Sequence, residues 1–80
     1  MALVTGGGSG IGEAIAACFV RNGAQVVVSG RTQARLQDSA ARTGAHPIAA
    51  DVADEERVRE LFTAIRDRFG GLDILVNNAG

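Results

Sequence analysis

Hydrophobic positions along this 80-residue chain follow two alternating patterns, short apolar runs and longer stretches with apolar residues every three or four positions. The short runs predict buried strands, because β-branched and apolar residues in succession suit a strand covered on both faces. These runs are Met1–Val4, Val26–Val28, His46–Ala50 and Leu72–Val76. The longer stretches predict amphipathic helices, which begin near Ile11, Thr32 and Asp54 and stop at Gly23, Gly44 and Gly70.

The predicted order is therefore strand, helix, strand, helix, strand, helix, strand, with connections too short for hairpins. Such alternation is typical of an α/β fold in which helices cover both faces of a parallel sheet. Right-handed crossovers in a doubly wound parallel sheet place the strands in the order 3-2-1-4. The third strand then lies at an edge, where the missing N–H of Pro47 is tolerated.

A glycine-rich octet, Thr5–Gly12, lies between the first predicted strand and the first predicted helix. Strand, glycine turn and helix N-terminus together hold phosphate, since free backbone N–H groups and the helix dipole face the anion. The absence of lysine excludes a P-loop, and the glycine spacing also differs from Gly-x-Gly-x-x-Gly. We interpret the octet as a dinucleotide-binding turn; the alternative is a merely flexible loop.

Three further segments should meet this turn at the carboxyl ends of the strands, where doubly wound sheets bind ligands. They are Gly30-Arg31, Asp51-Val52 and Asn77–Gly80. An NAD site usually has an acidic residue after the second strand to bind the ribose, whereas Arg31 offers a planar cation suited to a 2′-phosphate. The sequence favours NADP, with NAD possible; alternatively Arg31 is only an exposed loop residue.

Composition narrows the class of protein. With 46% hydrophobic and 21% charged residues the chain resembles a soluble globular domain, and a net charge of −1 argues against a nucleic-acid partner. No apolar run is long enough to span a membrane, and a single cysteine fits a reducing compartment, so we expect a cytoplasmic protein. We interpret Cys18 as core filler and His46 as a solvated residue, and we predict no metal site.

The paired motifs Thr5-Gly-x-x-x-Gly-Ile-Gly12 and Asn77-Asn-Ala-Gly80, with Asp51-Val52 between them, resemble the short-chain dehydrogenase/reductase family over the whole chain. Within it, the chain is similar to the group that includes 3-oxoacyl-carrier-protein reductases. The resemblance implies a Rossmann fold, an adenine contact from Asp51 and Val52, and a sheet-stabilising role for Asn77. NADP-preferring members often have a basic residue where this chain has Ser9. The implied cofactor-binding residues are Gly6, Gly8, Ser9, Gly10, Ile11, Gly12, Arg31, Asp51, Val52, Asn78 and Gly80.

Family members use a tyrosine and a nearby lysine for acid catalysis, and this chain contains neither residue. We therefore assign no catalytic residue and interpret residues 1–80 as the N-terminal part of a single Rossmann domain, truncated after the fourth strand. The predicted function is the cofactor-binding half of an oxidoreductase that acts on a carbonyl or secondary alcohol, in a homo-oligomeric parent. The alternatives are a non-catalytic dinucleotide-binding regulator and an inactive fragment.

Overall fold

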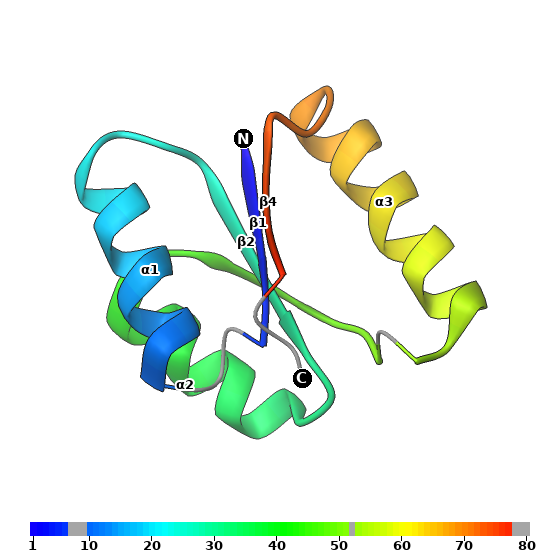
Figure 1. The fold of residues 1–80 in the computed structure, drawn as a ribbon, viewed down its shortest axis with the longest axis horizontal. Coiled ribbons are helices and arrows are strands. Elements are labelled where there is room, and N and C mark those ends of the chain that lie inside the picture. The colour runs from blue at the N-terminus through cyan, green and yellow to red at the C-terminus, as the bar shows by residue number, and fades with distance from the viewer. Residues whose placement is uncertain (7–9, 52, 78–80) are drawn as a thin grey trace.

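The computed structural model describes residues 1–6, 10–51 and 53–77 and contains seven elements in the predicted alternation (Figure 1). No helix in these residues is long and apolar enough to cross a membrane. The strands are β1 (Ala2–Thr5), β2 (Val26–Gly30), β3 (His46–Ala49) and β4 (Ile74–Asn77), and the helices are α1 (Gly10–Arg21), α2 (Gln33–Thr43) and α3 (Glu55–Phe69).

The four strands form one parallel sheet in the order β3-β2-β1-β4, which confirms the predicted topology. β3 lies at one edge, so Pro47 sits where a missing N–H costs least. Strands β1 and β4 are shifted by one or two residues from the predicted runs, because pairing fixes their ends. In that register Ala2 lies opposite Ile74, and Thr5 lies opposite Asn77.

Two hydrophobic clusters lie on the two faces of the sheet, since successive side chains of a strand point to opposite faces. Figure 1 shows α1 and α2 on one side and α3 on the other. On the first side Val4 and Val28 join Leu36 of α2 in one cluster. On the second side the preceding residues of the same two strands, Leu3 and Val27, pack against α3. The α3 residues of this second cluster are Leu61 and Ile65.

The ends of α2 and α3 follow the signals in the sequence. Gly44 and Gly70 adopt left-handed backbone conformations with φ of 84° and 83°, which favour glycine, and each donates its N–H to the last turn of the helix. Asp54 caps α3, because its side chain accepts hydrogen bonds from two backbone N–H groups of the first turn. α2 begins directly after Thr32, as predicted, and Thr32 is its N-cap residue, but the Thr32 side chain makes no capping hydrogen bond.

The orientation of α1 differs from the prediction. The expected apolar face included Ile11 and Cys18, yet Ile11 is 70% exposed and Cys18 is also exposed, so the interpretation of Cys18 as core filler is wrong. The buried positions of α1 are Gly12 and Ala16. Small residues at these positions turn toward the sheet, which lets the helix backbone lie close to the strands, while Ile15 and Phe19 pack at the sides.

A bidentate ion pair joins α1 to α2. Arg42 donates from Nε to Glu13 Oε1 at 2.6 Å and from its terminal nitrogen to Glu13 Oε2 at 2.9 Å. Hydrogen bonding to Arg42 lowers the pKa of Glu13 below its ordinary value of 4.5, and the pairing raises the pKa of Arg42. The planar fork of arginine suits a carboxylate, so this contact fixes the two helices relative to each other.

We expect this pair to make the stability of the fold depend on acid pH. Because the pKa of Glu13 is lowered in the folded state, the pair stabilises the fold fully above about pH 4.5, and the stabilisation is lost as the pH falls through the lowered folded value. In melting curves across this range, Glu13→Gln and Arg42→Gln should melt below the wild type at neutral pH, and the difference should shrink in acid. Variants whose melting temperatures stay parallel to the wild type at every pH would contradict this expectation.

The outer edge of β4 is apolar. β4 pairs with β1 on one side, and its Ile74 and Leu75 are 44% and 51% exposed. An edge strand with exposed apolar side chains invites pairing with another chain, and an 80-residue domain is only marginally stable.

We therefore expect the 80-residue chain to self-associate as its concentration rises, and Leu75→Lys to shift it toward the monomer. Analytical ultracentrifugation over a concentration series measures this. Thr63→Lys, on the exposed surface of α3, adds the same charge away from the edge and should leave association unchanged. A wild-type chain that stays monomeric at all concentrations would exclude the edge as an association surface.

Candidate functional site

The carboxyl ends of the parallel strands meet at one end of the sheet, and the glycine turn leaves β1 there. Gly6, directly after β1, has a φ of 67°, a left-handed conformation that glycine adopts without strain. Gly10 begins α1 and is exposed, and a Cβ built on it would meet no atom of the described residues within 4 Å apart from its chain neighbours and its own helix backbone. The described residues therefore leave room for a side chain at the first position of α1, and the next residue, Ile11, is exposed.

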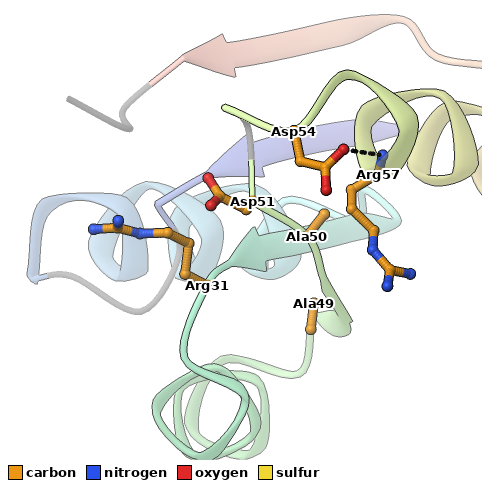
Figure 2. A pocket seen from close by; sticks show the side chains of 6 residues that line it. All are labelled: Arg31, Ala49, Ala50, Asp51, Asp54 and Arg57. Carbon is orange, nitrogen blue, oxygen red and sulfur yellow. Dashed lines mark hydrogen bonds between the residues drawn. The ribbon is translucent and has the colours of Figure 1, made fainter.

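A hollow of about 400 Å³ lies beside the ends of β2 and β3 (Figure 2). It brings together Arg31, which follows β2, and Asp51, which follows β3. These residues are far apart in the chain, and the sequence predicted that they would converge at this end of the sheet. The full lining is Arg31, Ala49, Ala50, Asp51, Asp54 and Arg57.

Asp51 is held in place by the turn that leads into α3. Its Oδ1 accepts the backbone N–H of Ala53 at 3.0 Å, and its carbonyl accepts the N–H of Asp54 at 2.9 Å. The side chain is half-buried, and no hydrogen bond from the described residues is recorded to Oδ2. A carboxylate fixed through one oxygen presents the other as an acceptor for an amino group.

Arg31 brings a positive charge to the hollow, whereas Asp51 brings a negative one. It is exposed, and within residues 1–6, 10–51 and 53–77 its guanidinium makes no ion pair. Gly30 before it packs closely enough that an added Cβ would lie 3.7 Å from Leu36, an ordinary contact. Arg31 therefore follows the end of β2 with its charge available for an anion.

Polar groups also connect the strands beneath this end of the sheet. Thr5 donates its hydroxyl to the carbonyl of Val76 at 3.2 Å and to Asn77 Oδ1 at 3.3 Å, so Asn77 ties β4 to β1. This link between β4 and β1 agrees with the sheet-stabilising role that the resemblance implies for Asn77. Ser29 Oγ, opposite Thr5 in β2, is fully buried with no hydrogen-bond partner among the described residues.

Several predicted site residues lie outside the described residues, and their roles stay predictions. They are Gly8, Ser9, Val52, Asn78 and Gly80. Gly12 is described and is buried in α1, as is Ala16 one turn further along, and its role in cofactor binding also stays a prediction.

Asp54 and Arg57 also line the hollow, although the sequence predicted neither as a site residue. Their short distance from Asp51 along the sequence could have indicated that they line the hollow. A helix that begins a few residues after a strand keeps its first turn beside the end of that strand. No cluster of potential metal ligands occurs in the part of the chain that the structure describes.

The lining of the hollow fits the adenosine end of a dinucleotide. Ala49 and Ala50 offer methyl groups to a ring face, Asp51 offers an acceptor to an amino group, and Arg31 offers donors to a phosphate. A helix N-terminus such as that of α1, which begins at an exposed glycine, suits a pyrophosphate. The apolar groups, the hydrogen-bond acceptor and the donors of this lining therefore suit a nucleotide.

Comparisons with known proteins point the same way. An uncharacterised oxidoreductase of Staphylococcus aureus (strain N315) is 46% identical over 83 residues, covering 100% of this chain and 36% of that protein. Menthone neomenthol reductase from Mentha piperita superposes with a TM-score of 0.92 at 35% identity, covering 99% of this chain and 31% of the reductase. A crystal structure named ribose-5-phosphate isomerase, from Brucella melitensis 16M, superposes with a TM-score of 0.94 at 40% identity, covering 99% of this chain and 31% of that one.

The chain thus spans about a third of the length of the curated relatives that it matches. The isomerase name shows that likeness in this part of the fold does not by itself decide the reaction. The family model described as short chain dehydrogenase matches residues 1–80, the whole chain. With the parallel sheet in the order β3-β2-β1-β4 and a family model that covers every residue, this chain belongs to the short-chain dehydrogenase family.

Proposed function

We propose that this chain is the cofactor-binding half of an NAD(P)(H)-dependent oxidoreductase acting on a carbonyl or secondary alcohol. The observation that carries the proposal is the hollow that joins Arg31 to Asp51 at the ends of β2 and β3. Within its lining, the cation of Arg31, the anchored carboxylate of Asp51 and the methyl groups of two alanines are the groups that a phosphorylated adenosine requires. Membership of the short-chain dehydrogenase family and the oxidoreductase names of relatives support the redox class.

Within this proposal the predicted cofactor-binding residues have the following roles. The turn from Gly6 to Gly12 holds the pyrophosphate, Asp51 accepts a hydrogen bond from the adenine amino group, and Arg31 binds a 2′-phosphate. NADP is preferred over NAD because no acidic residue follows β2 to bind a free ribose hydroxyl. When bound, the nicotinamide supplies or accepts the hydride.

The acid–base chemistry of the reaction belongs to the rest of the protein. Neither tyrosine nor lysine occurs in these 80 residues, so we expect the acid and the substrate-binding residues outside them. We also propose a homo-oligomeric, cytoplasmic protein whose partner is a small carbonyl or alcohol.

The test uses the full-length protein. Isothermal titration with NADPH and NADH measures binding, and the absorbance of the reduced nicotinamide during incubation with ketones, aldehydes and secondary alcohols measures turnover. We expect binding of both cofactors, tighter for NADPH, and turnover with at least one substrate class. Binding without turnover across the panel would favour the non-catalytic regulator, and absence of binding would overturn the proposal.

A further inference from the structure

We infer that Arg57 contacts the adenine base of the bound dinucleotide and contributes equally to the binding of NADPH and NADH. This inference rests on the proposed function and adds a residue to the site. Arg57 lines the same hollow as Arg31 and Asp51, although it belongs to the first turn of α3.

The position of Arg57 is fixed at its backbone and near its guanidinium. Its backbone N–H faces Asp54 Oδ1, the capping carboxylate, at 3.4 Å. Its Nη1 donates to Glu60 Oε2 at 3.1 Å, one turn further along α3. The guanidinium is therefore tethered at the rim of the hollow.

The two arginines occupy different parts of the hollow. Figure 2 shows the side chain of Arg31 extending to the left and that of Arg57 extending downward at the right, with Ala49 and Ala50 between the two arginines in this view. Arg31 follows β2, next to the end of the sheet where the glycine turn begins, whereas Arg57 comes from α3 on the other side. A ligand that enters from the glycine turn and places its ribose at Arg31 extends its base toward the alanines and Arg57.

The charges around Arg57 favour a base over a phosphate. Glu60 already neutralises its guanidinium, and the Asp54 carboxylate lies close by, so an added phosphate would meet negative charge on the same turn. A guanidinium paired at its edge still has a free planar face, and such a face stacks on aromatic rings. Adenine, with apolar faces and a polar edge, can lie against the alanine methyls and this guanidinium while Asp51 receives its amino group.

The experiment compares dissociation constants in the full-length protein. Arg57→Ala should weaken NADPH, NADH and 5′-AMP by the same factor, about two- to fivefold, as expected for an exposed cation–π contact. The ratio of the NADPH and NADH constants should not change. Arg57→Lys, which keeps the charge but loses the plane, should show most of the same loss.

Arg59→Ala is the matched control, because Arg59 lies on the same helix, pairs with Glu55 and does not line the hollow. Weakening of NADPH alone by Arg57→Ala would identify a phosphate contact and overturn the inference. Unchanged constants for all three ligands, with the wild type binding normally, would overturn it and leave the proposed function standing. A wild type that binds none of them would overturn both. If Arg57→Ala lowers the melting temperature, Arg57→Lys decides the outcome.

Discussion

Replacing Gly10 by valine is expected to abolish dinucleotide binding while the fold stays intact. A Cβ at Gly10 would meet no atom of the described residues within 4 Å apart from its chain neighbours and its own helix backbone, so those residues leave room for it. In the proposed complex the pyrophosphate approaches the α1 N-terminus, and a branched side chain at Gly10 would obstruct that approach. We expect a loss of about a hundredfold or more in affinity for NADPH and NADH, roughly 2.8 kcal/mol at the lower limit.

Gly10 is a sharper test than its neighbours in the motif. Gly6 has a left-handed φ of 67° and Gly12 is buried, so valine at either position should also reduce binding, but partly by disturbing the fold. Ala14→Val introduces the same side chain one turn along the exposed side of α1 and should leave binding unchanged. Titration calorimetry measures the affinities, and melting curves verify the fold. Unchanged affinity in Gly10→Val would exclude the turn as a phosphate site.

Arg31→Asp is expected to reverse the cofactor preference of the full-length protein from NADPH to NADH. A charge-assisted hydrogen bond to the 2′-phosphate contributes about 1.5–3 kcal/mol, about ten- to a hundredfold in affinity. Because Arg31 is exposed, solvent screening should bring the effect toward the lower value. The substitution adds repulsion against a phosphate, whereas with NADH the new carboxylate can accept hydrogen bonds from the ribose hydroxyls.

The measurement is the pair of dissociation constants for wild type and variant at one fixed ionic strength. Arg35→Asp changes the net charge equally on exposed α2, away from the lining of the hollow, and should leave the ratio of constants nearly unmoved. Raising the salt concentration should reduce the NADPH preference of the wild type, since exposed charges are screened. A wild type that prefers NADH, or a variant with the wild-type ratio, would make Arg31 an ordinary surface residue.

The amino-acid sequence by itself determined the order of elements and the topology of the sheet. Apolar runs with strand character alternate with helical periodicity, and right-handed crossovers leave few ways to arrange four parallel strands. Local chemistry also determined helix ends: Gly44 and Gly70 stop α2 and α3, and Asp54 starts α3, because these signals act within a single turn of backbone. The meeting of Arg31 and Asp51 followed from topology alone, since both leave carboxyl ends of neighbouring strands.

The tertiary structure decided which side chains of each helix are buried against the sheet and which are exposed. Periodicity marks an apolar stripe on α1, but the close approach of helix and sheet selects Gly12 and Ala16 and leaves Ile11 and Cys18 exposed. Helix–sheet distance depends on side-chain volumes on both elements, and no single-segment pattern contains that information.

Arg57 is a second residue whose surroundings were decided by the tertiary structure. In sequence it is one of several charged residues on the polar face of α3, and the hollow that it lines with Arg31 forms only when β2 and β3 pair. Likewise, the hydroxyl of Thr5 finds Asn77 only after β4 pairs beside β1. Contacts between residues far apart in the chain depend on the packing of whole elements, so they become defined only when the sheet and its helices are assembled.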